Sequence, residues 1–482
     1  MADIYIDPDF GGTPAGTFAA PWVDFPTPAS NNNYWLKRGT HLIRSTRINI
    51  SDLQNITVGA YYDDGGSPAY DDNTDLPKPK WSCYQTLTSA VFTETNPGVS
   101  NIWTWTSPGT ATENRGLFLL GLGRVGDASG PSWEVRAKYF NTGTNETGFT
   151  TFGQWDAGRA GDSDKELAIY SENDPYTDYG TIYYSSKTDT PCLNISAFAA
   201  DIDWNITVQD IHFMQAGVGL KVYTNTREGR DLTITRCMFD HCGTGLNITQ
   251  GGTGAGLNNV NIINNKFDEC GTHGIFFGAG KCGVRIANNQ VFRTGAADCI
   301  GGIYGPPNKN ASADPYTCIV ENNYVDTVYP VTQYWSYEQR CIYLEHEGNN
   351  CHVRSNICVN AHNAGLHSNT GDGPNWFYNN VIINCGKGIE DSDAASKGVG
   401  NTYYFNNTII NSTASGFAIS RPASPTDTKM NYLYNNIFIG TGGNSAINLG
   451  TSADNAGILT CDNNIVHNYS NAITRDGVTA GL

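Results

Sequence analysis

The chain has 482 residues, with 46 acidic and 29 basic side chains, which gives a formal net charge of −17 at pH 7. This charge argues against nucleic acid as a partner, because nucleic-acid affinity depends on Lys and Arg contacts to phosphate. It also disfavours a densely anionic polysaccharide as substrate, although a local basic cleft can outweigh the net charge. No apolar run approaches the roughly 18 residues of a membrane span, so we predict no membrane insertion.

Residues 1–100 are predicted to form an amino-terminal lead-in and the first coils of the fold. Ile4 to Pro8 is typical of a short strand, and Gly16-Thr17 and Ala20-Pro21-Trp22 are typical of turns. The first residues hold no basic segment followed by an apolar one, so no secretory signal is visible. Residues 101–200 break the later rhythm with Gly- and Thr-rich sequence, and we expect a β-rich insertion or elaborated coils there.

A paired asparagine returns at regular intervals from Val260 to Val466, each time before a short apolar stretch. The interval is 24 residues from Asn265 to Asn289 and 29 residues from Asn407 to Asn436, which is the range of stacked repeats. A single Asn356 occupies one of these places. The doublets are Asn264-Asn265, Asn288-Asn289, Asn322-Asn323, Asn379-Asn380, Asn406-Asn407, Asn435-Asn436 and Asn463-Asn464.

A second motif, usually Gly or Cys followed by Ile or Leu, keeps phase with the asparagines over nine copies, from Gly-Leu-Lys-Val at 219 to Ala-Ile-Asn-Leu at 446. Each repeat therefore holds two or three short strands, which can bury their apolar face only by stacking on the next repeat. Leucine-rich repeats need several Leu per unit, whereas Ile, Val, Phe and Cys occupy the apolar positions here. We predict an all-β parallel β-helix over residues 201–470, followed by a tail over 471–482.

The recurring asparagine has a physical explanation, because Asn tolerates a left-handed backbone and its amide can hydrogen-bond to an Asn one rung away. The 13 cysteines are placed as informatively. Cys242, Cys270 and Cys385 fall at equivalent positions of different repeats, which predicts a buried stack of small apolar side chains. Disulfides along that stack stay an alternative, and the lack of Cys-x-x-Cys pairs argues against a zinc site.

The succession from Ile4 to Tyr61, with its Gly-Thr and Ala-Pro-Trp turns, resembles the amino-terminal signature of right-handed parallel β-helix proteins of the pectate-lyase-like superfamily. The Asn-Asn and Gly-Ile repeats resemble the helix repeats of the same superfamily, so the resemblance covers most of the chain. It implies a right-handed β-solenoid with an amino-terminal cap. The function stays open, because the superfamily includes polysaccharide lyases, glycoside hydrolases, epimerases and bacteriophage tailspike depolymerases.

Resemblance to the tailspikes implies a homotrimer and an extracellular or virion-associated location. The chain departs from two familiar subfamilies. It lacks the Asp-rich calcium and Arg pattern of pectate lyases, and it lacks the Asn-Thr-Asp and Arg-Ile-Lys motifs of polygalacturonases.

Acidic residues and histidines crowd the outward positions of three consecutive coils. If the apolar residues of the segment 341–347 point inward, strand alternation turns Tyr343 and Glu345 outward. The next two coils present His367 and Asn369, and then Glu390. With rungs about 4.8 Å apart, His367 neighbours both Tyr343 and Glu390, while the backbones of Glu345 and Glu390 lie roughly 11 to 12 Å apart.

Two long connections, 304–317 and 326–340, flank the first of these coils, and long loops on a rigid scaffold are where binding residues usually lie. The second is dense in aromatic side chains. We therefore predict polysaccharide contacts from Tyr304, Trp335, Tyr337, Arg340, Tyr343, Glu347 and Asn369.

Glycoside hydrolysis needs two carboxyl groups, about 5 to 5.5 Å apart for retention of configuration or roughly 6.5 to 9.5 Å apart for inversion. We nominate Glu345 as the acid and Glu390 as the base, beside His367, because clustered acids raise one another's pKa and so keep one of them protonated near neutral pH. Asp391, Asp393 and Glu347 are the substitutes. This mechanism requires no metal or other cofactor.

Elimination on a uronate polymer is the first alternative, because it needs a base and a cation that neutralises the uronate carboxylate. His367, Tyr343 and Arg340 can fill those roles, with calcium on Glu345 and Glu347. A phage-tail protein that binds a glycan receptor without cleaving it is the second, and a structural solenoid used for adhesion is the third. In the last case the His367–Glu390 pair is a surface contact worth at most about 1 kcal/mol.

Overall fold

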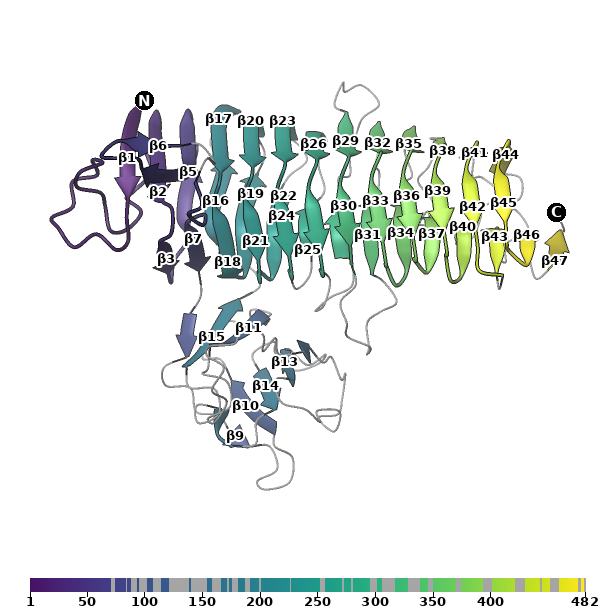
Figure 1. Cartoon of the computed structure of the whole chain (residues 1–482), viewed down its shortest axis with the longest axis horizontal. Coiled ribbons are helices and arrows are strands. Elements are labelled where there is room, and N and C mark those ends of the chain that lie inside the picture. Colours follow the sequence, from purple (N-terminus) through teal and green to yellow (C-terminus); the bar gives the residue numbers. More distant parts are fainter. Residues whose placement is uncertain are drawn as a thin grey trace.

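The chain folds as an all-β, right-handed parallel β-helix of about ten turns (Figure 1), which confirms the predicted fold class. Among the described residues, no helix has the length and apolar character needed to cross a membrane. The computed structural model describes residues 1–70, 74–83, 85–87, 93–94, 102–106, 114–120, 138–139, 154–157, 166–170, 173–175, 181–186, 191–198, 201–225, 227–251, 256–270, 273–278, 281–294, 301–305, 317–327, 339–345, 350–369, 374–392, 401–420, 430–442, 444–450, 459–475 and 478–480.

Three long parallel sheets form the walls of the solenoid, and each coil contributes one strand to each sheet in turn. Sheet 1 carries β1 (Ala2–Ile6), β2 (Asn32–Lys37), β5 (Ile56–Asp63), β17 (Ile202–Gln209), β20 (Glu228–Thr235), β23 (Gly256–Ile263), β26 (Lys281–Ala287), β29 (Cys318–Glu321), β32 (Cys351–Arg354), β35 (Asn375–Tyr378), β38 (Thr402–Phe405), β41 (Asn431–Tyr434) and β44 (Leu459–Asp462), with β6 (Pro68–Ala69) antiparallel to β5.

In each repeat with an asparagine turn, the strand that follows the turn belongs to sheet 2. This sheet carries β3 (His41–Arg44), β7 (Lys80–Cys83), β18 (His212–Ala216), β21 (Met238–Asp240), β24 (Lys266–Asp268), β27 (Gln290–Phe292), β30 (Tyr324–Asp326), β33 (Ile357–Val359), β36 (Val381–Ile383), β39 (Thr408–Ile410), β42 (Ile437–Ile439) and β45 (Ile465–His467).

Sheet 3 completes each coil and carries the second sequence motif. Its strands are β4 (Ile48–Ser51), β16 (Pro191–Ala197), β19 (Val218–Thr224), β22 (Thr244–Gln250), β25 (His273–Phe277), β28 (Gly301–Tyr304), β31 (Arg340–Glu345), β34 (Ala364–Asn369), β37 (Lys387–Asp391), β40 (Ser415–Ile419), β43 (Ser445–Asn448), β46 (Asn471–Arg475) and β47 (Val478–Ala480), the last antiparallel to β46.

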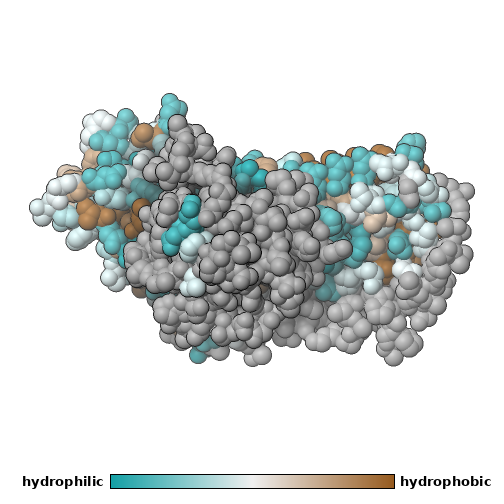
Figure 2. Space-filling view, turned by 90° about the horizontal axis from the view of Figure 1, so that it is seen from below, coloured by the Kyte–Doolittle hydropathy of each residue, from teal (hydrophilic) through white to brown (hydrophobic). Residues whose placement is uncertain are grey.

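Eight strands between β7 and β16 form two small sheets beside the solenoid (Figure 1). The chain leaves sheet 2 after Cys83 and re-enters sheet 3 at Pro191, so these strands expand one turn of one coil. They are β8 (Gln85–Leu87), β9 (Thr93–Glu94), β10 (Ile102–Thr106), β11 (Asn114–Leu120), β12 (Lys138–Tyr139), β13 (Gln154–Ala157), β14 (Glu166–Tyr170) and β15 (Thr181–Ser186). Figure 2 shows the molecule from below the orientation of Figure 1. The described residues of the solenoid that are visible there include both hydrophilic and hydrophobic side chains.

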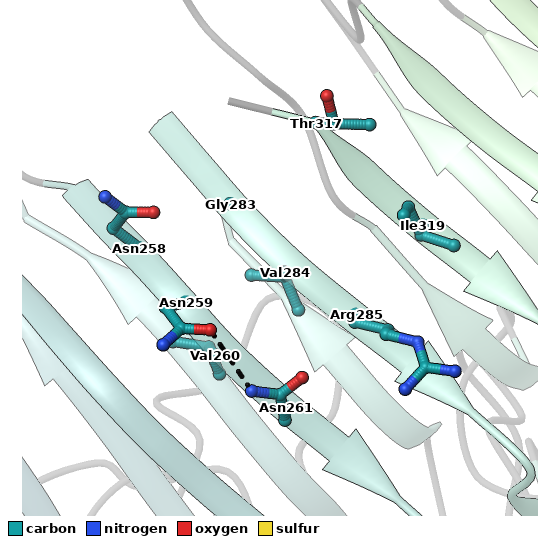
Figure 3. Close-up of a pocket in the computed structure, with 9 residues that line it drawn as sticks. All are labelled: Asn258, Asn259, Val260, Asn261, Gly283, Val284, Arg285, Thr317 and Ile319. Carbon is teal, nitrogen blue, oxygen red and sulfur yellow. Dashed lines mark hydrogen bonds between the residues drawn. The ribbon is translucent and has the colours of Figure 1, made fainter. Parts of the chain in front are cut away.

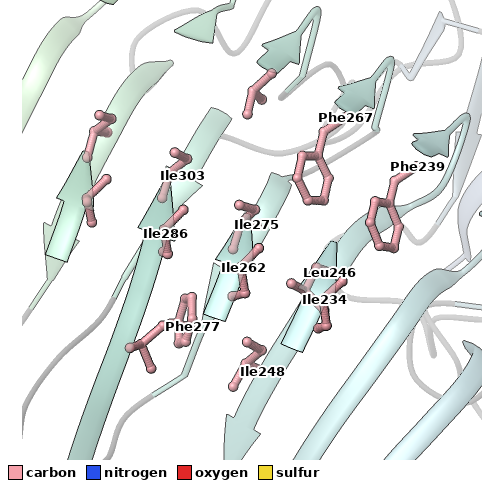
Figure 4. Close-up of a cluster of buried hydrophobic side chains, with 14 of the residues drawn as sticks. Ile234, Phe239, Leu246, Ile248, Ile262, Phe267, Ile275, Phe277, Ile286 and Ile303 are labelled. Carbon is pink, nitrogen blue, oxygen red and sulfur yellow. The ribbon is translucent and has the colours of Figure 1, made fainter. Parts of the chain in front are cut away.

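The core lies inside the prism that the three sheets enclose (Figure 4). Phe213, Phe239 and Phe267 stack one coil above another, with ring centroids 5.2 and 4.7 Å apart, and all three are fully buried. Columns of Ile, Leu and Val line the other two walls. Each fully buried side chain of this size contributes about 1.5 to 3 kcal/mol by leaving water, so stacking supplies the stability that one coil cannot generate alone.

The glycine of the second motif reflects the close approach of successive coils. A Cβ atom at Gly245 would lie 2.6 Å from the carbonyl oxygen of Gly274 and 2.7 Å from the Phe267 ring. The cysteines of the same region are buried free thiols. Of the eleven cysteines whose side chains are described, ten are buried and all are free thiols, which confirms the predicted burial for these residues.

The two members of each asparagine doublet have different roles. The first adopts the left-handed conformation, with φ between 55° and 59° from Asn264 to Asn463, and Ser355 takes this place where the doublet is incomplete. The second is buried and joins a ladder. The Asn380 Oδ1 accepts hydrogen bonds from the backbone N–H and the side-chain amide of Asn356, each at 3.0 Å. Both predicted properties of asparagine are thus confirmed, on neighbouring residues.

Replacing a ladder asparagine should destabilise the solenoid strongly. Asn380→Ala removes the acceptor of two hydrogen bonds and the donor of two more, to the Val353 carbonyl and Asn407, each 2.9 Å long. Because each unpaired buried group costs about 1 to 3 kcal/mol, we expect a loss of at least about 3 kcal/mol in urea denaturation followed by circular dichroism. The control is Asn384→Gly, at an exposed left-handed position, which should cost about 1 kcal/mol or less. Equal losses would contradict the ladder's role.

Candidate functional site

The three coils singled out by sequence stack in the predicted register on the outward face of sheet 3. Tyr343 on β31 pairs with His367 on β34, and His367 pairs with Glu390 on β37. Glu345 pairs with Asn369, so it lies two rungs and two residues away from Glu390. The expected adjacency of Tyr343, His367 and Glu390 is therefore confirmed.

His367 is buried although it lies on an outward position, with only 2% of its surface exposed. Its Nε2 is hydrogen-bonded to the hydroxyl of Ser392. Its Nδ1 lies 3.3 Å from the Glu390 carboxylate but is not aligned for a hydrogen bond. Burial, reinforced by the nearby cations Arg340 and Lys387, holds the pKa of His367 well below 6.5. The imidazole is therefore neutral near pH 7, and one ring nitrogen is not satisfied by the protein.

Glu390 is buried to the same degree, with 4% exposure, and is held by its neighbours. Its Oε1 accepts hydrogen bonds from the ammonium group of Lys387 and from the hydroxyl of Ser420, the latter at 2.7 Å. Its Oε2 has no hydrogen-bond partner and faces His367. Because Lys387 already balances the charge of Glu390, the neutral state of His367 is consistent with a carboxylate only 3.3 Å away.

Aromatic rings continue the column towards the amino terminus. The Tyr343 ring packs against His367 with centroids 4.6 Å apart and against Tyr304 at 5.2 Å. The Arg340 guanidinium lies over the Tyr343 ring, 4.8 Å from its centroid, and the Asn369 amide donates to the Tyr343 hydroxyl at 3.0 Å. Arg340, Tyr304, Tyr343 and Asn369, four of the predicted polysaccharide contacts, thus form one connected cluster with His367.

Asp391, nominated as a substitute carboxylate, points to the other side of its strand. It pairs in register with Ile419 of the core, is fully buried, and accepts a hydrogen bond from the Tyr404 hydroxyl at 3.0 Å. Strand alternation explains this placement, because the residue after an outward Glu390 must point inward. Asp391 lies inside the solenoid, away from the face that carries His367.

Several predicted residues lie outside the description. Trp335, Tyr337, Glu347 and Asp393 fall outside the described residues, and only the backbone of Glu345 is described. Their roles stay predictions. Among the described residues, no group of three or more His, Cys, Asp or Glu side chains could hold a metal ion. The calcium expected for elimination was assigned to Glu345 and Glu347, and it also stays a prediction.

Sequence reasoning missed two groups that hold Glu390. Lys387 lies three residues before it on the same strand, and Ser420 follows the next strand, β40. Lys387 could have been found by aligning the repeats, because it stands in register with Ala364 and, one rung further, with Arg340. Two cations therefore occupy one column beside the His367–Glu390 pair.

The neutral state of His367 predicts a pH dependence of stability. Its folded pKa lies below its unfolded value of about 6.5, so the unfolded chain binds the extra proton first as the pH falls. The stability contributed by neutral His367 is complete above about pH 6.5 and is lost below it, by at most about 1.4 kcal/mol per pH unit.

In urea denaturation between pH 7 and 5, His367→Gln should show a shallower loss of unfolding free energy than the wild type. His41, whose pKa is lowered to about 4 by burial and by Lys80 and His212, contributes a slope of the same sign, so part of the slope remains. An unchanged slope in His367→Gln would show that folding does not lower the pKa of His367.

A family model described as "Right handed beta helix region" matches residues 196–382. Among solved structures, XylC in complex with xylose is 11% identical, over 97% of this chain and 86% of that chain, with a TM-score of 0.38. A lacto-N-biosidase from Eubacterium ramulus is 10% identical, over 97% and 68%, with a TM-score of 0.39.

A tailspike of Pseudomonas phage phi297 is 11% identical, over 87% of this chain and 70% of that chain, with a TM-score of 0.28. No curated protein matches. At these identities the likeness concerns the fold alone. The family match over residues 196–382 and the three stacked sheets agree on the fold, which is a right-handed parallel β-helix.

Proposed function

We propose that the protein is a carbohydrate-active enzyme that cleaves a polysaccharide on the outward face of sheet 3, at β31, β34 and β37. The buried His367–Glu390 pair carries this proposal. Burying a charged carboxylate costs several kcal/mol unless its partners compensate, and an outward sheet position offers the chain an exposed alternative. A polar pair that is buried there, and that keeps one nitrogen and one oxygen without hydrogen-bond partners, suits a ligand site.

Hydrolysis is the reaction we place first. Glu390 suits the part of the ionised carboxylate, since Lys387 and Ser420 hold its Oε1 while its Oε2 stays available. Glu345 is the proposed acid, two rungs and two residues away. At about 4.8 Å per rung, this backbone offset favours the wider carboxyl separation of an inverting enzyme over the shorter one of a retaining enzyme. Neutral His367 would position Glu390, and the rings of Tyr343 and Tyr304 would border the sugar.

The test is activity on a panel of neutral and uronate-containing polysaccharides, measured as new reducing ends. We expect Glu390→Gln and Glu345→Gln to lower the rate by about a thousandfold or more, because each removes a group that the two-carboxylate mechanism requires. Asp462→Asn, which alters an exposed carboxylate on β44, is the matched control and should keep wild-type activity. Thermal melts establish that the variants are folded. Full activity in Glu390→Gln would refute this assignment.

Elimination is the second candidate, and the cluster of Arg340, Tyr343, His367 and Asn369 favours it. A neutral imidazole, or a tyrosine ionised to its phenolate, can take the proton from the carbon that carries the uronate carboxylate. The electron pair of that C–H bond then forms a carbon–carbon double bond, the glycosidic C–O bond breaks, and the leaving oxygen takes up a proton. Arg340 would stabilise the carboxylate during this step.

Elimination and hydrolysis differ in their products. Elimination leaves an unsaturated uronate that absorbs ultraviolet light, whereas hydrolysis leaves none. If elimination operates, we expect ultraviolet-absorbing product from uronate polymers, lost in His367→Ala, Tyr343→Phe or both. Reducing ends without absorbance would exclude elimination. Binding without any product would instead support the glycan-receptor function, for which the extracellular or virion-associated location and the homotrimer stay predictions.

A further inference from the structure

The outward face of sheet 1, a different wall of the solenoid from the one that carries His367, holds a strip of stacked aromatic side chains. From β32 to β41, the outward positions of sheet 1 form two columns in register, and all of their members are half-buried. We call these eight residues the aromatic strip: His352, Trp376, Tyr403 and Tyr432 in one column, and Arg354, Tyr378, Phe405 and Tyr434 in the other.

The rings of the strip stack along the solenoid axis. His352 and Trp376 have centroids 4.4 Å apart and planes 16° apart, and Tyr403 and Tyr432 have centroids 4.9 Å apart and planes 9° apart. Because the faces cover one another, solvent meets mainly ring edges and tyrosine hydroxyls. The gap is wider between Trp376 and Tyr403, at 6.1 Å, which leaves part of each face less covered.

The core does not require this strip. The inward positions of the same strands are filled by Val353, Phe377, Tyr404 and Leu433, each of which is fully buried. The coils from β17 to β26 manage without outward aromatics, since the same column holds Thr207, Thr233, Asn261 and Arg285. In the first coils, Tyr5, Trp35 and Tyr61 form a separate buried cluster instead. On sheet 1, stacked rings that stay half-buried are therefore local to the four coils from β32 to β41, which is the pattern of a binding surface rather than of a structural element.

A shallow pocket of about 330 Å³ continues the strip towards the amino terminus (Figure 3). Ile319 lines the pocket and pairs in register with His352, the first residue of the strip. The asparagine amides and Arg285 supply polar groups there. The lining residues are Asn258, Asn259, Val260, Asn261, Gly283, Val284, Arg285, Thr317 and Ile319.

Between pocket and strip, one carboxylate engages two guanidinium groups. Glu321 accepts hydrogen bonds from Arg285 and Arg354, each at 2.7 Å. Burial and the neighbouring Arg354 lower the pKa of His352, so its ring is uncharged near pH 7. Because Glu321 engages both guanidinium groups, the surface offers mainly apolar edges, hydroxyls and amides, which suit the C–H faces and hydroxyls of neutral sugars.

The size of the strip favours a chain-like ligand over a second protein. Four rungs span roughly 15 Å, and two residues along a strand span about 7 Å, so the strip covers on the order of 100 Å². A stable protein interface needs about 800 Å² from each partner. A narrow strip with a pocket in line fits one extended oligomer.

We propose that the outward face of sheet 1, from the pocket to Tyr432, is a second binding surface that holds a neutral linear polysaccharide along the solenoid axis. It lies on a different sheet from the candidate cleavage site. The choice of a sugar polymer rests in part on the proposed function, because one polysaccharide would then occupy both surfaces.

The test is affinity electrophoresis of the full chain in gels containing dextran, a β-glucan or a galactomannan, with a polyuronate gel for comparison. Glu390→Gln serves as the background, so that cleavage does not obscure binding. We expect retardation in at least one neutral gel, and a loss of about tenfold or more in affinity in Trp376→Ala/Tyr403→Ala. Trp376→Phe/Tyr403→Phe keeps stacked rings and should restore most of the affinity. Thr207→Ala/Thr233→Ala changes the same column in earlier coils and should bind as the background does.

Three results would overturn the proposal. Unchanged affinity in a folded Trp376→Ala/Tyr403→Ala variant would do so, as would retardation in none of the neutral gels. A concentration-dependent oligomer in sedimentation that disappears in the same variant would make the strip an interface between copies. Turnover with intact Glu390 reports the proposed function separately: it should persist on short oligosaccharides in the strip variants. Strip-dependent binding without turnover would refute the cleavage site alone.

Discussion

The hydrogen-bonded column of buried asparagines is the interaction on which the rest of the molecule depends. Each ladder asparagine binds backbone groups of neighbouring coils, as Asn356 does with the carbonyl of Val320 and the side chain of Asn380, and so fixes the register between coils. A slip of one residue would turn every outward side chain inward. Only with this register do Tyr343, His367 and Glu390 meet in one column on sheet 3, and only then do the rings from His352 to Tyr432 stack on sheet 1.

Against this regular background, the outward face of sheet 3 is unusual in electrostatic terms. A solenoid can leave polar side chains in water at every outward position, yet His367 and Glu390 are buried and tied to Ser392, Lys387 and Ser420. The ammonium group of Lys387 opposes the charge of the Glu390 carboxylate, and the imidazole of His367 stays neutral. Such an environment stabilises one fixed protonation pattern, which is what acid–base chemistry on a sugar requires.

Much of this could be predicted from the sequence, because the repeat period and strand alternation act locally. The Asn doublets gave the coil length, and the outward positions of three strands placed Tyr343, His367 and Glu390 side by side. The same alternation puts Asp391 inward against Tyr404, so its place among the substitute carboxylates conflicts with the rule that placed Glu390. Strand alternation cannot predict how deeply an outward side chain is buried. The burial of His367, and the contacts of Glu390 with Lys387 and Ser420, depend on side chains packed from several coils. The aromatic strip was not predicted, because its members are spread through the sequence over four separate coils and meet only in the folded sheet.

The expanded turn between β7 and β16 shows how such a protein can vary. Roughly one hundred residues replace a connection of a few residues, and the neighbouring strands still pair as in other coils. The entropy of closing a loop rises only with the logarithm of its length, by about 0.6 kcal/mol for each doubling, so growth of this size adds only about 3 kcal/mol. The ladder tolerates no comparable change. In a solenoid of this kind, the turns between sheets 2 and 3 can therefore be remodelled while the column of Tyr343, His367 and Glu390 beside them keeps its spacing.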